Sequence, residues 1–185
     1  MHSFQWVQAS LGIIVSLAMT RIAASVVNMA VLRGSVRLDW LPFAWAFGVF
    51  LLLLQFSWNF VALDGVITAW KFVDFIFLLL VVFNLFIAAA LILPSSEAQA
   101  AGDLRVWHQK HGRWALLFIA IYTGLSYAVN WHFGGGDPRE NPAGAIFSAV
   151  ALTGFLTGSR RVLAVMTVLF LLATMGLLAE MLALG

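Results

Sequence analysis

The sequence lacks cysteine altogether. A disulfide framework, a thiolate metal site and a cysteine nucleophile are therefore excluded. Charge is also scarce, because only 10% of the 185 residues are charged, where soluble domains carry about 25%. The net charge of +2 comes from a few arginines in short loops, and we expect no nucleic-acid partner from it.

Most residues of the chain are apolar. They make up 63% of the chain, and the mean hydropathy is +0.98. A water-soluble fold of this size exposes too much surface to hide so many apolar side chains. The sequence therefore predicts that a lipid bilayer is the solvent for most of the protein.

The apolar residues fall into runs of membrane-spanning length. A helix needs roughly 20 apolar residues to cross the hydrocarbon core, and on this measure residues 1-185 form one all-α transmembrane bundle of about six spans. The predicted spans are 4-32, 41-63, 67-93, 113-131, 143-159 and 162-184. The first is too long for a secretory signal, so we expect it to be retained. The fifth is short and either crosses fully or re-enters.

The predicted orientation follows from lysine and arginine in the connections. Seven of these residues lie in connections between spans one and two, three and four, or five and six: Arg33, Arg37, Arg105, Lys110, Arg113, Arg160 and Arg161. The other side has only Arg139. Cytoplasmic loops carry the excess of positive charge, so we expect a multi-pass protein with both termini outside.

Polar residues inside the predicted spans are the candidate functional groups. Arg21 lies deep in the first span, where a central arginine costs about 2.5–3.5 kcal/mol on insertion scales. Three spans carry a polar stripe, and together the stripes predict a polar intramembrane path: Arg21, Ser25, Asn28, Gln55, Asn59, Thr123, Tyr127 and Asn130. The alternative is that these groups hydrogen-bond neighbouring helices and hold the bundle together.

Two smaller groups of ionisable residues lie near span ends. Lys71 and Asp74 are one helical turn apart and can pair, and with Glu180 they predict a charge cluster at the outer side. His108 and His111 share a basic segment, which we expect to be solvated and to face lipid headgroups rather than to bind a metal. All four histidines lie at span ends or in loops, which excludes an intramembrane bis-histidine haem. The sequence identifies no cofactor.

Several aromatic-rich segments resemble an uncharacterised family of small bacterial six-span membrane proteins. The residues that carry the resemblance are Leu11-Gly12 through Thr20-Arg21, Trp40 through Trp45, Leu54 through Trp58, Trp70 with Phe72 and Asp74, Pro94, and Asp103 through Trp114. The resemblance covers most of residues 5-131. It implies a six-helix inner-membrane architecture and a bacterial source, and it implies no activity.

Two functions fit these features. The first is a small ion or solute channel or transporter that uses the polar path. The second is an accessory or assembly subunit that packs against a larger membrane complex, and either protein could be a homo-oligomer. An intramembrane enzyme is disfavoured, because the sequence shows no recognisable catalytic set of carboxylate, histidine and cysteine residues.

Overall fold

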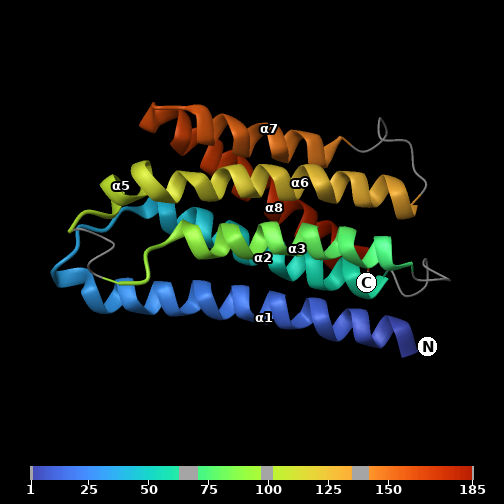
Figure 1. Cartoon of the computed structure of the whole chain (residues 1–185). Coiled ribbons are helices and arrows are strands. Elements are labelled where there is room, and N and C mark those ends of the chain that lie inside the picture. The colour runs from blue at the N-terminus through green and yellow to red at the C-terminus, as the bar shows by residue number, and fades with distance from the viewer. Residues whose placement is uncertain (1, 63–70, 97–101, 135–141, 185) are drawn as a thin grey trace.

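The chain folds as a bundle of helices. The computed structural model describes residues 2–62, 71–96, 102–134 and 142–184, and the regular structure within them is helical, with one isolated β-bridge between Arg37 and Asp103. The helices in chain order are α1 (His2–Val31), η1 (Leu32–Gly34), α2 (Trp40–Ala62), α3 (Phe72–Ile92), α5 (Leu104–Trp107), η3 (His108–Gly112), α6 (Arg113–Gly134), α7 (Ala143–Leu156) and α8 (Arg160–Leu184). Figure 1 shows the long helices lying side by side.

The predicted spans match these helices closely within the described residues, and the expected start of the third span at residue 67 lies outside them. The second span was expected at 41-63 and α2 covers Trp40–Ala62; the last was expected at 162-184 and α8 covers Arg160–Leu184. The first helix ends before the Arg33-Gly34 turn, and α3 ends at Ile92, two residues before Pro94. Proline disfavours helical backbone at the residue before it, which explains the second boundary.

Five helices are long and apolar enough to cross a membrane. The exception is α7, with 14 residues. At 1.5 Å per residue it is about 21 Å long, which is shorter than the hydrocarbon core of about 30 Å. The expected all-α fold is therefore confirmed, and five of its helices suit a membrane, while six full crossings and the outward position of the termini stay predictions.

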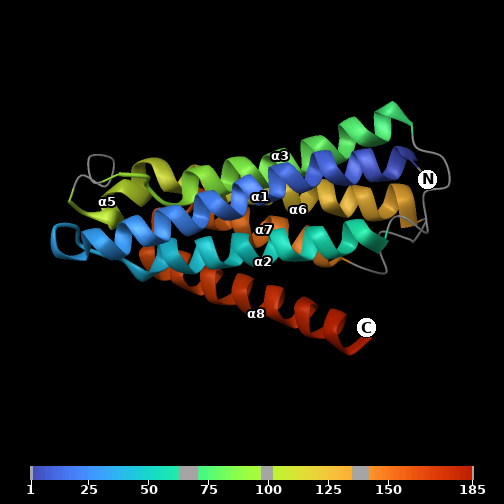
Figure 2. The ribbon, with the colours of Figure 1, turned by 90° about the horizontal axis from the view of Figure 1, so that it is seen from below.

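The bundle has two distinct ends, which Figures 1 and 2 show. The ends of α1, α3 and α7 and the starts of α2, α5 and α8 lie together at one end, which we call the arginine end because five arginines lie in or beside them: Arg33, Arg37, Arg105, Arg160 and Arg161. The N-terminus and the starts of α3 and α7 lie at the opposite end. These five arginines thus lie on one side of the bundle.

Glycine allows two close helix approaches. A Cβ atom at Gly48 of α2 would lie 2.8 Å from the Phe170 ring of α8. A Cβ atom at Gly144 of α7 would lie 2.7 Å from Tyr127 of α6. Small residues at such points let helix backbones pack closely within a membrane. The buried fraction of the most apolar stretch falls from 61% in α2 to 17% in α8, so α8 lies at the edge of the bundle.

Candidate functional site

Two connections are joined by backbone hydrogen bonds at the arginine end. The Arg37 amide donates to the Gly102 carbonyl at 2.8 Å, and the Leu104 amide donates to the Arg37 carbonyl at 3.1 Å. Gly102 has a φ of +78°, a left-handed conformation that glycine adopts at little cost. These bonds fix the approach to α2 beside the start of α5, and so place Asp39 near the segment that contains His108.

Asp39 is buried at the start of α2, with 8% of its surface exposed. Its carboxylate accepts a hydrogen bond from the Leu41 amide at 3.2 Å and two from the Arg160 guanidinium at 2.5 and 2.9 Å. Burial by itself would raise the pKa of Asp39, but the hydrogen bonds from Arg160 and Leu41 and the charge of Arg160 outweigh it and lower the pKa below 3.8. Asp39 is therefore a carboxylate at neutral pH.

A turn of π-helix, His108–Gly112, joins α5 to α6 and presents His108 to the interior. Only 3% of His108 is exposed, and neither ring nitrogen has a hydrogen-bond partner. A Cβ atom at Gly112 would lie 2.6 Å from His108 Nδ1 and 2.8 Å from the Trp107 ring, so glycine is required for this packing. Such π-turns are rare and often occur at functional sites.

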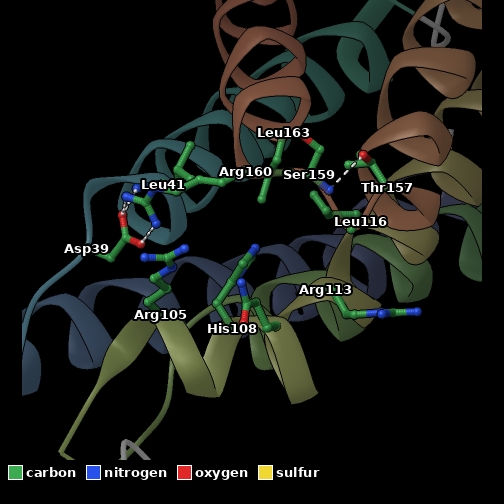
Figure 3. A pocket seen from close by; sticks show the side chains of 13 residues that line it. Asp39, Leu41, Arg105, His108, Arg113, Leu116, Thr157, Ser159, Arg160 and Leu163 are labelled. Atoms are coloured by element: carbon green, nitrogen blue, oxygen red, sulfur yellow. Dashed lines mark hydrogen bonds and ion pairs between the residues drawn. The ribbon is translucent and has the colours of Figure 1, made fainter.

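These groups surround a cavity of about 270 Å³. Its lining residues come from three stretches of the chain, 39–41, 105–116 and 154–163: Asp39, Leu41, Arg105, His108, Gln109, Arg113, Leu116, Gly154, Thr157, Gly158, Ser159, Arg160 and Leu163. Figure 3 shows Arg105 and His108 rising toward the Asp39–Arg160 pair. The Arg113 guanidinium points away and lies 5.2 Å from the centre of the Phe155 ring.

The lining is rich in hydrogen-bond donors. An unpartnered buried ring nitrogen costs about 1–3 kcal/mol, so the free nitrogens of His108 favour a ligand that satisfies them. The volume is slightly below the about 300–1,000 Å³ of typical small-molecule pockets, which suits a ligand of few atoms. The site can bind and orient a small polar molecule.

The expected solvation of the histidine segment is wrong for His108 and right for His111. His111 is exposed, whereas His108 is buried beneath the ends of α2 and α8. The sequence shows His108 among charged neighbours, which is typical of a surface segment. The burial arises from the π-turn and from helices distant in sequence, so only the aromatic Trp107 and the nearby Gly112 hinted at close packing. No three His, Asp or Glu residues in the described ranges are grouped as a metal site.

The polar stripe of the first span bonds within α1, to α3 and to the residues just after α3. Arg21 donates to the Ser25 hydroxyl at 3.1 Å and to the Ala90 carbonyl at 3.3 Å. Asn28 donates to the Ser95 carbonyl at 3.0 Å. These contacts are of the helix-joining kind that the sequence left open as the alternative to a path.

The other predicted path residues lie at different interfaces. Gln55 is buried and donates to the Thr174 carbonyl of α8 at 3.1 Å, while Thr123 is buried and bonds to carbonyls of its own helix. Tyr127 contacts α7 beside Gly144, and Asn59 and Asn130 are exposed. The structure brings Arg21, Ser25 and Asn28 together, but it separates them from the stripes of α2 and α6. One shared path stays a prediction.

The expected outer cluster is also distributed differently. Asp74 is buried at the start of α3, where it accepts a hydrogen bond from the Lys71 amide at 3.2 Å and contacts His132 Nε2 at 3.4 Å. The Lys71 side chain is exposed, as is Glu180 on α8. The partner of Asp74 from another helix is thus His132, which the sequence did not associate with it.

Comparison with known proteins does not identify a family for this chain. No family model matches the chain, and no match is found among curated proteins or among solved structures. The resemblance to a six-span bacterial family therefore stays a prediction, and the function has to be argued from the bundle and its cavity.

Proposed function

We propose that this protein is a small membrane transporter or channel that binds its solute in the cavity at the arginine end. The observation that carries the proposal is His108, a buried histidine with two unpartnered ring nitrogens in a cavity of about 270 Å³. On the positive-inside rule the arginine end faces the cytoplasm of a bacterial cell, so the cavity would receive or release solute there.

A row of polar residues on α8, which begins at the cavity with Arg160, supports this proposal. Arg160, Thr167 and Thr174 are spaced seven residues apart on α8, so they share one face of the helix. Both threonines are fully buried, and Gln55 of α2 donates to the Thr174 carbonyl. Both threonine hydroxyls donate to carbonyls of their own helix, and the row ends where Gln55 of α2 meets α8.

The test is solute flux in proteoliposomes. The purified protein is reconstituted and the uptake of a panel of small anions and neutral solutes is measured against empty vesicles. We expect uptake of at least one solute, and we expect His108→Leu to abolish most of it by removing both ring nitrogens at similar volume. Absence of flux above empty vesicles for the whole panel would count against transport.

His111→Leu is the matched control. His111 lies in the same π-turn but is exposed, and it does not line the cavity. The two variants remove the same chemical group from positions three residues apart. Flux that falls equally in both variants would point to a general effect on the turn instead of a role for the cavity.

An accessory subunit is the second candidate, and the exposed face of α8 favours it. Only 17% of the most apolar stretch of α8 is buried, and its exposed side chains include Val165, Val168, Leu169, Leu172 and Met175. Lipid can cover such a face, and so can helices of a larger complex. Native mass spectrometry after extraction in mild detergent distinguishes them: a stoichiometric foreign subunit supports this candidate, and a particle of this chain and lipid alone contradicts it.

A further inference from the structure

We propose that the cavity is an oxyanion site. Before a ligand binds, the Asp39 carboxylate binds the Arg160 guanidinium, and a phosphate-type ligand displaces it. The inference deepens the proposed function by naming the chemistry of the solute. It rests on the arrangement of charge, on His108 and on the start of α8.

The charge of the lining favours an anion. Three arginines and one carboxylate line the cavity, namely Arg105, Arg113, Arg160 and Asp39. Arg113 is engaged with Phe155, so Arg105 and Arg160 are the two cations beside the open space. Arg160 alone has a carboxylate partner in the cavity, and planar guanidinium groups bind phosphate and carboxylate oxygens in pairs.

The start of α8 adds oriented donors. Ser159 precedes the helix, and its carbonyl accepts the first helical hydrogen bond, from the Leu163 amide at 3.0 Å. The first amides of a helix have no partner within it, and they carry partial positive charge. Helix starts are recurrent phosphate-binding sites for this reason. Thr157 and Ser159, which line the cavity here, supply hydroxyl groups.

His108 provides the independent sign of a ligand. It is 97% buried, since 3% of it is exposed, and both of its nitrogens are unsatisfied. A Cβ atom at Gly112 would lie 2.6 Å from Nδ1, so Nδ1 faces this glycine, and Nε2 is the nitrogen that we assign to the ligand. No described protein group is within hydrogen-bond distance of either nitrogen, and we infer that a ligand oxygen is the missing partner. His108 is therefore placed to complete the set of donors around an oxyanion.

Asp39 mimics the ligand. Its two oxygens accept both hydrogen bonds from the Arg160 guanidinium, which is the geometry that a bound carboxylate or phosphate would have. Asp39 thus competes with the ligand for Arg160. Removing its charge should strengthen oxyanion binding, while removing Arg105 or Arg160 should weaken it.

Titration calorimetry with inorganic phosphate tests this directly, on the full chain in phosphate-free maltoside micelles. We expect saturable binding to the wild type, about tenfold tighter binding to Asp39→Asn, and about tenfold weaker binding to Arg105→Gln. Asn keeps the oxygen that accepts the Leu41 amide, so the start of α2 is retained. Arg105 is exposed, so Arg105→Gln should fold even if Arg160→Gln does not.

Asp74→Asn is the matched control. Asp74 is equally buried and also accepts a backbone amide at a helix start, but it lies at the opposite end. We expect phosphate binding to be unchanged in this variant. Equal affinity of Asp39→Asn and wild type would overturn the competition between Asp39 and the ligand.

A second arm distinguishes free phosphate from a lipid headgroup. Native mass spectrometry after mixing with phosphatidic acid or phosphatidylcholine shows whether an anionic lipid is retained in an Arg105-dependent manner. Binding of either phosphate or phosphatidic acid supports the oxyanion site and identifies its source. Binding of neither, to the wild type and to Asp39→Asn, overturns it. Phosphate binding without flux would reject transport alone, and flux without phosphate binding would reject the oxyanion site alone.

Discussion

Each end of the bundle places an aspartate at a helix start: Asp39 is the residue before α2, and Asp74 is the third residue of α3. Asp39 and Asp74 are each 8% exposed, and each accepts a backbone amide at the start of a helix. A carboxylate at this position offsets the unpaired amides and the positive helix end. The local sequence therefore explains why an aspartate is found at each position, but it does not explain what each aspartate does.

The partner from another helix makes the difference. Asp39 receives two hydrogen bonds from Arg160, a permanent cation, and it borders the cavity. Asp74 has one contact of 3.4 Å to His132, whose side chain is 61% exposed and packs against Phe77 and Phe133. A structural cap becomes part of a candidate binding site only where long-range packing adds cations and space.

Replacing each aspartate by alanine should give the largest measurable contrast. Asp39→Ala removes a cap and two charge-assisted hydrogen bonds, and we expect a loss of about 2 kcal/mol in the free energy of unfolding. Asp74→Ala removes a cap and a weaker contact, and we expect about 1 kcal/mol. Unfolding in mixed micelles, followed by helical circular dichroism, measures both. Equal losses would show that the cap dominates at each end.

Substitutions at two glycines can separate an effect on stability from an effect on phosphate binding. Gly112→Ala inserts a methyl group against His108 and Trp107, and Gly144→Ala inserts one against Tyr127. Each should cost about 1–2 kcal/mol through overpacking. Only Gly112→Ala should also weaken phosphate binding, because it displaces His108. Binding and unfolding measured on the same preparations separate the effects, and an equal loss of binding in Gly144→Ala would contradict the assignment.

Low pH should reduce the contribution that Asp39 makes to the free energy of unfolding. The pKa of Asp39 is lowered in the folded state, so its charge stabilises the fold above the ordinary value of 3.8. This contribution is lost as the pH falls through the lower, folded-state pKa. The stability difference between wild type and Asp39→Asn should therefore be full near pH 6 and shrink below about pH 4. A difference that is constant down to pH 3 would show that the charge of Asp39 does not matter.

Hydropathy predicted the helices of the bundle because the thickness of the hydrocarbon core sets the length of each apolar run. The limits of α2 and α8 were expected within two residues, since charge, proline and glycine end the runs. The cavity could not be predicted in this way. Asp39 and Arg160 are 121 residues apart, and no local pattern pairs them.

Polar residues in the spans were identified correctly as unusual, but their partners depend on three-dimensional packing. Arg21 bonds to a carbonyl of α3, and Gln55 bonds to one of α8. A helical stripe indicates which face of a helix is polar, and it does not indicate which neighbour meets that face. For the same reason the sequence missed His108, whose charged neighbours concealed its burial.

The π-turn before α6 has a consequence for the register of the whole segment. In a π-turn the amide of residue i+5 donates to the carbonyl of residue i, so the turn holds one residue more than an α-helical turn. The helix before the turn is therefore rotated by about 100° relative to the helix after it. Leu104 and Trp107 can thus be buried at the arginine end while Leu116 and Ile119 are buried further along. The extra residue thus changes which side chains of α5 face the interior relative to those of α6. Losing one residue from this turn would leave α6 intact but turn His108 and the Asp103 cap away from the groups they now meet.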